Sequence, residues 1–129
     1  MAWILFVDDD PYTLEIYKKA VELFGHHAVV AGMGEDALKL AQEHKPDIIF
    51  LDMNMPDMNG FELLERLQKL DATARIPAVM LTASNQFENE DLAEQAGAVA
   101  FVQKPIRIDE LKNLIEKYAS SGTSGVQLA

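Results

Sequence analysis

Polar side chains with phosphoryl-transfer chemistry stand at the ends of four apolar runs in this sequence. Asp8 and Asp9 end the first run, and Asp52 ends the third. Thr82 and Lys104 come at the ends of the fourth and fifth. Two carboxylates about 4 Å apart repel by roughly 4 kcal/mol at an effective dielectric of 20, so three together either raise a pKa or recruit a cation. Oxygen ligands without Cys or His select a hard ion, which predicts Mg²⁺, with Mn²⁺ as a substitute.

Beside such an ion, Asp52 is a candidate nucleophile toward phosphorus, and the product would be an acyl phosphate. Phosphoryl transfer requires in-line geometry and neutralised equatorial oxygens. The metal would neutralise one oxygen and the Lys104 ammonium a second. The Thr82 hydroxyl and nearby backbone N–H groups would donate to the third. Taken singly, each residue has a simpler interpretation as a helix cap, a solvated lysine or a strand former, and only the set indicates this chemistry.

Short apolar runs alternate with amphipathic segments along the chain. The predicted strands are Trp3–Val7, Ala28–Ala31, Asp47–Leu51, Pro77–Leu81 and Val99–Val102. The predicted helices are Pro11–Phe24, Asp36–His44, Phe61–Leu70, Phe87–Ala96 and Ile108–Tyr118. This alternation is typical of an open, doubly wound parallel α/β sheet covered on both faces. Ligands bind such sheets beyond the carboxyl ends of the strands, where the polar side chains stand.

Length and charge limit the class of protein. At 129 residues the chain forms one domain, predicted over 1–119, with a flexible Ser- and Gly-containing tail over 120–129. The tail would be a linker remnant, a natural end or an expression scar. A net charge of −10 would repel a phosphate backbone, so we expect no nucleic-acid binding. The apolar start is too short for a signal or membrane segment, so we expect a cytoplasmic protein without membrane contact.

The chain resembles the receiver domain of two-component response regulators from about residue 3 to residue 118. The matching segments are Val7–Pro11, Leu51–Gly60, Leu81–Ala83 and Phe101–Pro105. Each segment alone is weak, but the set with these spacings is highly specific. The resemblance implies a five-stranded (βα)5 sheet of the flavodoxin-like type, with the strand order 2-1-3-4-5.

The resemblance also implies the metal and acceptor residues. Asp52 would be the phosphoacceptor. Asp9 would bind the metal directly, Asp8 would act partly through water, and the Asn54 main-chain carbonyl would complete the protein ligands, with Asp52 itself among them. An amide at position 54 would tune how quickly the phosphoryl group is lost, and we expect a lifetime of seconds to minutes.

Further residues of the family's switch find counterparts here. The Thr82 side chain would move toward the phosphoryl group, and the Lys104 ammonium would form an ion pair with it. Phe101 would be the switch aromatic, and Ala83 would supply the small residue beside the phosphoryl group. The resemblance also implies a cis peptide bond before Pro105.

The function predicted is therefore phosphorelay signalling, with a sensor histidine kinase or a His-phosphotransfer protein as the donor. The chain would act on its own Asp52 and not as an enzyme on outside substrates. Two alternatives stay open: a Mg²⁺-dependent phosphatase, for which Asn54 is a poor proton donor, and a degenerate receiver that serves only as an interaction module. Lys and Arg are absent between Arg75 and Lys104, so the charge-interleaved dimer of some receivers is not expected and we predict a monomer.

Overall fold

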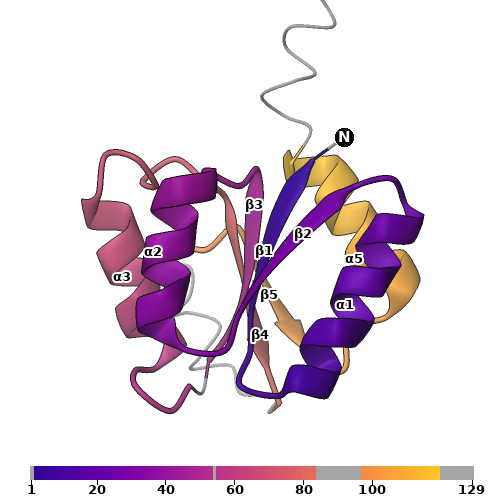
Figure 1. Ribbon diagram of the computed structural model, residues 1–129, viewed down its shortest axis with the longest axis horizontal. Coiled ribbons are helices and arrows are strands. Elements are labelled where there is room, and N and C mark those ends of the chain that lie inside the picture. The colour runs from indigo at the N-terminus through magenta and orange to yellow at the C-terminus, as the bar shows by residue number, and fades with distance from the viewer. Residues whose placement is uncertain (1, 54, 84–96, 120–129) are drawn as a thin grey trace, which may run out of the picture.

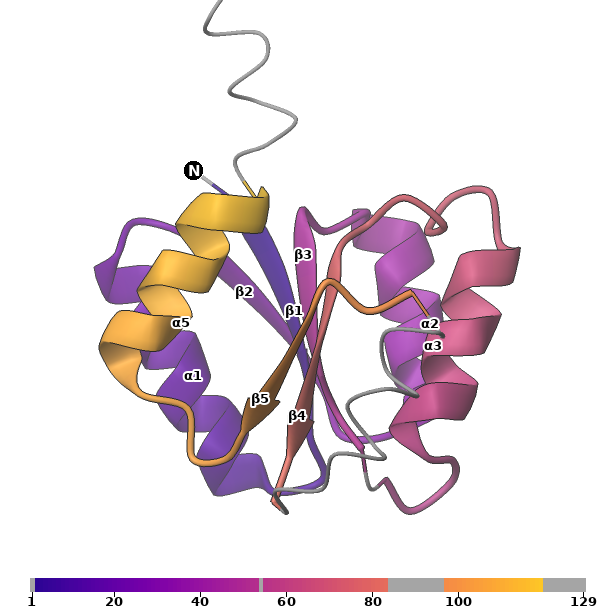
Figure 2. The ribbon, with the colours of Figure 1, turned by 180° about the vertical axis from the view of Figure 1, so that it is seen from behind.

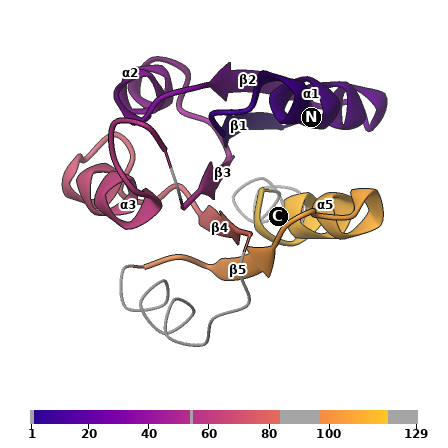
Figure 3. The same cartoon turned by 90° about the horizontal axis from the view of Figure 1, so that it is seen from below.

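Five parallel strands form a single sheet in the computed structural model, which describes residues 2–53, 55–83 and 97–119. The strands are β1 (Trp3–Val7), β2 (His27–Ala31), β3 (Ile48–Asp52), β4 (Ala78–Thr82) and β5 (Ala100–Gln103). Figure 3 looks along the sheet and shows the order β2-β1-β3-β4-β5. Every neighbouring pair is parallel. The predicted fold class and strand order are confirmed.

Helices cover both faces of this sheet. The helices α2 (Gly34–His44) and α3 (Gly60–Lys69) lie on one face (Figure 1). On the other face lie α1 (Pro11–Leu23) and α5 (Ile108–Leu114), and α5 continues as a π-helical turn over Ile115–Ala119 (Figure 2). Every residue of β3 and β4 is buried, as expected for central parallel strands between two helical layers. The predicted helix Phe87–Ala96 lies outside the described residues.

The first helix begins at Pro11, as the sequence predicts, and buries one face against the sheet. Asp10 accepts hydrogen bonds from the Tyr12 N–H at 3.1 Å and from the Thr13 hydroxyl at 2.7 Å, which caps the helix. The buried side chains of this helix are Leu14, Tyr17, Ala20 and Val21, whereas Ile16 is 59% exposed. Ile16 therefore does not extend the core. Among the described residues, no helix is long and apolar enough to cross a membrane.

Three strands end one residue later than their apolar runs predict. The run in β3 ends at Leu51 and the run in β4 at Leu81, yet the pairing continues through Asp52 and Thr82. Backbone hydrogen bonding to a neighbouring strand, which the side-chain pattern does not reveal, decides where each strand ends. As a result, the backbones of Asp52 and Thr82 belong to the sheet and hold their side chains at its carboxyl edge.

Candidate functional site

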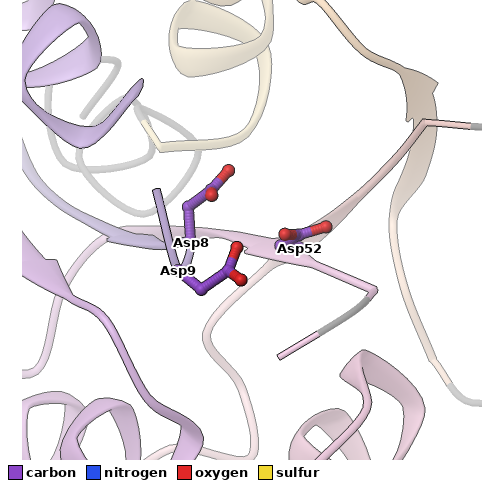
Figure 4. A group of neighbouring side chains, drawn as sticks. All are labelled: Asp8, Asp9 and Asp52. Carbon is purple, nitrogen blue, oxygen red and sulfur yellow. The ribbon is translucent and has the colours of Figure 1, made fainter. Parts of the chain in front are cut away.

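Three carboxylates meet where β1 and β3 end. These strands are neighbours, and Val7 of β1 pairs with Leu51 of β3. Asp8 and Asp9 directly follow β1, and Asp52 is the last residue of β3. One carboxylate oxygen from each lies within 4.8 Å of the other two (Figure 4). We call Asp8, Asp9 and Asp52 the acid cup, and the structure brings them together as the strand-end pattern predicts.

Two of the three acids are almost completely shielded from water. Asp8 is 1% exposed and Asp52 is 5% exposed, whereas Asp9 faces solvent. Asp8 Oδ1 accepts a hydrogen bond from the Asp10 N–H at 2.9 Å. Asp8 Oδ2 is buried and, within the described part of the chain, has no hydrogen-bond donor in good geometry. A buried carboxylate oxygen in this position is stabilised only by positive charge.

Lys104 supplies part of that charge. Its Nζ lies 2.8 Å from Asp8 Oδ2 and 3.4 Å from Asp52 Oδ2, and its side chain is 22% exposed. Burial opposes the ammonium charge and by itself would lower the Lys104 pKa. The Asp8 contact and the Asp52 charge outweigh burial and leave that pKa above its ordinary value of 10.5. The side chain thus remains an ammonium ion held between two carboxylates.

The remaining predicted residues lie around the same edge. Thr82 is buried at the end of β4, and the exposed Ala83 follows it. The Lys104 N–H donates to the Thr82 carbonyl at 2.6 Å, and the Lys104–Pro105 peptide bond is cis, as the resemblance implies. Phe101 on β5 is half-buried and packs against the core beneath α2 and α3. Asn54 lies outside the described residues.

The loop that follows Asp52 is closed tightly at its base. The Gly60 N–H donates to the Met53 carbonyl at 2.7 Å. A Cβ atom on Gly60 would lie 2.8 Å from the Asp52 carbonyl oxygen and 2.9 Å from Met53 Cα. Backbone atoms cannot move aside as a flexible side chain can, so only glycine fits at this position.

Replacing Gly60 with alanine is therefore expected to lower the free energy of unfolding by about 1–3 kcal/mol, because the added methyl group displaces backbone. Urea unfolding followed by circular dichroism measures this change. Gly32→Ala is the matched control, since a Cβ there would meet its nearest neighbour, the Asp8 carbonyl oxygen, only at 4.0 Å. Equal effects of the two substitutions would show that crowding at Gly60 is unimportant.

Asp57 is a residue that the sequence analysis missed. Its Oδ1 accepts a hydrogen bond from the Gly34 N–H at 2.8 Å and its Oδ2 one from the Glu35 N–H at 3.0 Å. These bonds cap α2 from another segment, which explains why α2 begins two residues before its predicted start. The sequence gives little signal for this contact, because the partners are 22 and 23 residues apart. The Glu35 side chain forms an ion pair with Arg66 of α3, in which Glu35 Oε1 lies 3.1 Å from Arg66 Nη1.

The hydrogen bonds from Gly34 and Glu35 hold the Asp57 pKa below its ordinary value of 3.8. A lowered pKa in the folded chain adds stability that is present above pH 3.8 and is lost as the pH falls through the folded value. We therefore expect wild type to be more stable than Asp57→Asn at pH 7, with the difference shrinking below pH 3.8. Urea unfolding of both proteins across this range measures the difference, and a gap that grows on acidification would contradict the assignment.

The composition of the acid cup fits a hard divalent cation. Its ligands are carboxylate oxygens alone, and the described residues set three carboxylates against the single ammonium of Lys104. The buried Asp8 Oδ2 still lacks a well-directed donor. Mg²⁺ prefers such oxygens and is held in proteins by one or two carboxylates together with water.

A protein-family model described as the response regulator receiver domain matches residues 4–116. The chain belongs to this family. Receiver domains are signalling modules that bind Mg²⁺ through an acidic pocket, and this receiver domain has an acidic cluster in its acid cup.

Relatives and solved structures agree with this assignment. The receiver domain is 29% identical over 115 residues to the polar-differentiation response regulator DivK of Brucella anthropi, covering 89% of this chain and 94% of that protein. A CheY-like receiver domain protein from Methanospirillum hungatei has a TM-score of 0.88 at 28% identity, covering 97% of this chain and 98% of that one. The chemotaxis protein CheY4 of Vibrio cholerae has a TM-score of 0.86 at 28% identity, covering 92% and 98%.

Proposed function

We propose that this receiver domain accepts a phosphoryl group on Asp52 from a phosphohistidine-bearing protein and transmits a signal by changing conformation. The observation that carries the proposal is the Lys104 ammonium between Asp8 and Asp52, in a cup with an excess of carboxylates. In such a cup, the Lys104 ammonium can leave the carboxylates when a divalent ion and an incoming phosphoryl group bind. The closeness of Asp8, Asp52 and Lys104 at one edge of the sheet supports this exchange.

Asp8, Asp9, Asp52 and the Asn54 carbonyl would hold the metal. Bound Mg²⁺ would neutralise charge on the phosphoryl oxygens. An Asp52 carboxylate oxygen attacks phosphorus in line with the donor's histidine nitrogen. The O–P bond forms while the P–N bond breaks, and the electron pair returns to the imidazole. Lys104 moves from the carboxylates to a phosphoryl oxygen, and Thr82 donates its hydroxyl hydrogen to another.

The signal would be a shift between two conformations of the β4–β5 edge. Thr82 ends β4, and its main chain is joined to Lys104 by a hydrogen bond of 2.6 Å. Phe101 lies on β5, which ends one residue before Lys104, and its side chain is half-buried. Ala83 leaves space beside the phosphoryl group. Movement of the Thr82 side chain toward phosphate would thus alter the packing of Phe101.

The surface beside the cup supports a protein as the donor. In α1, which begins just after the acid cup, Tyr12 is 81% exposed and Ile16 is 59% exposed. Residues four apart lie on the same helix face, so these two side chains form a continuous exposed apolar surface, which suits contact with another protein. A sensor histidine kinase or a His-phosphotransfer protein would bring its phosphohistidine to the cup across this helix.

The resulting acyl phosphate would be lost slowly by hydrolysis within the same chain. Asn54 cannot donate a proton as an acid would, so turnover of outside phosphate esters is not proposed. Release of inorganic phosphate from Asp52 would reset the receiver without a second protein. Multiple turnover of a phosphate ester would favour a phosphatase instead.

Asp52→Asn is expected to abolish phosphorylation. With Mg²⁺ and acetyl phosphate, the wild-type chain should gain the mass of one phosphoryl group, because this donor replaces the phosphohistidine. Intact-protein mass spectrometry measures the gain, and chelation of Mg²⁺ should suppress it. Asp71→Asn, at an exposed position after α3, is the matched control and should behave as wild type. Equal labelling of Asp52→Asn would exclude Asp52 as the acceptor.

A further inference from the structure

We infer that Asp57 is a positioning residue for the acid cup. It ties the loop over residues 55–59 to the first turn of α2, so that ion binding in the cup and the order of that turn are coupled. This inference deepens the proposed function and rests on the metal site proposed there. It depends on contacts made by the described residues on both sides of position 54.

The tip of the loop is fixed to α2. The N-cap residue of this helix, Met33, makes no side-chain capping bond. Both oxygens of Asp57 take that place by accepting the N–H groups of Gly34 and Glu35. The buried side chain of Met58 fills the space beneath Gly34, where an added Cβ would lie 2.5 Å from Met58 Cγ. The helix end and the loop tip therefore move together.

The base of the loop is fixed to the acceptor strand. The Met53 N–H donates to the Leu81 carbonyl at 3.0 Å, which extends the pairing of β3 with β4 beyond Asp52. The Met53 carbonyl accepts the Gly60 N–H, and Gly60 itself packs against the Asp52 main chain. Residues 57–60 form a continuous described segment, so a displacement of Asp57 reaches the Asp52 main chain through Gly60.

In the described residues, no other side chain accepts a hydrogen bond from the Gly34 or Glu35 N–H. Arg66 joins α3 to α2 through Glu35 at 3.1 Å, and within α3 it pairs with Glu62 at 3.0 Å. All three side chains are about half exposed or more. Exposed ion pairs of this kind contribute little to stability. Loss of the Asp57 carboxylate would thus remove the hydrogen bonds between the loop tip and α2 and leave the packing of Met58 beneath Gly34 to hold them.

The test compares Mg²⁺ affinity by calorimetry in the full chain. We expect Asp57→Ala to bind Mg²⁺ about three- to tenfold more weakly, less than the 10–100-fold typical of a partner hydrogen-bonded directly to a ligand. Asp57→Asn keeps an acceptor oxygen and should recover part of the affinity. Asp36→Asn removes an equal charge from the same exposed turn of α2 and should change affinity by less than about twofold.

A reciprocal measurement separates positioning from general loss of stability. Because coupling between two sites is mutual, Mg²⁺ should slow hydrogen exchange at the Gly34 and Glu35 amides in wild type and not in Asp57→Ala. Unchanged Mg²⁺ affinity in Asp57→Ala, or an equal loss in Asp36→Asn, would overturn the inference while leaving the proposed function intact. Failure of wild type to bind Mg²⁺ would overturn both.

Discussion

In the absence of metal, Asp52→Ala should be more stable than wild type by about 1–3 kcal/mol. The acid cup places three carboxylates together, and the Lys104 ammonium compensates them only in part. Asp52 is 5% exposed, so solvent screens its repulsion with Asp8 and Asp9 poorly. Removing the Asp52 carboxylate leaves two carboxylates in the cup, and the Lys104 ammonium forms a nearly neutral pair with one of them, Asp8. Urea unfolding in excess chelator measures the gain.

Added Mg²⁺ should reverse this order. A ligand that binds only the folded state raises its stability by RT ln(1 + [L]/Kd), so wild type, which would bind Mg²⁺ more tightly, would gain more than the variant. Asp71→Ala provides a control, since substitution of an exposed acid away from the cup should change stability by less than about 0.5 kcal/mol. A lower melting temperature for Asp52→Ala in chelator would refute the repulsion that this prediction assumes.

Lys104→Met should have the opposite effect and lower the metal-free stability by about 1–3 kcal/mol, below the 3–5 kcal/mol typical of breaking a fully buried pair. The lysine Nζ is 2.8 Å from the buried Asp8 Oδ2, which would then keep no cation. Methionine retains much of the side-chain volume, so packing is largely preserved. Chemical unfolding of wild type and variant in chelator measures the loss.

A double-mutant cycle shows whether this loss arises in the cup. Lys104→Met should cost less in an Asp52→Ala background, because one of the two carboxylates that the ammonium contacts is gone. Mg²⁺ should restore part of the stability of Lys104→Met, since the ion would supply the missing positive charge. Additive effects of the two substitutions, with no recovery by Mg²⁺, would place the role of Lys104 elsewhere.

The acid cup could be located from sequence because it depends on local signals. Asp8 and Asp9 stop one apolar run and Asp52 stops another, and in a parallel sheet such positions share an edge. The position of β1 beside β3, in contrast, could not be predicted from these local signals. Strand neighbours are chosen by contacts between distant segments, and the order came from the family resemblance, which the structure confirms.

Other features depend on contacts that no local pattern records. Asp57 reads as an ordinary loop acid, and only the fold brings it to the N–H groups of Gly34 and Glu35. The sequence predicts that Lys104 contacts a phosphoryl group. Its position between Asp8 and Asp52 in the metal-free chain depends on how the ends of β1, β3 and β5 are arranged. In both cases the missing information is the distance between segments far apart in sequence.

Chemical location of the phosphoryl group tests the central claim most directly. Borohydride reduces an acyl phosphate of aspartate to homoserine, so the wild-type chain treated with Mg²⁺, acetyl phosphate and borohydride can be digested and sequenced by mass spectrometry. We predict homoserine at position 52 and aspartate at positions 8 and 9. Homoserine at position 8 or 9, or none in a chain that gained a phosphoryl group, would contradict the assignment of Asp52 as the acceptor.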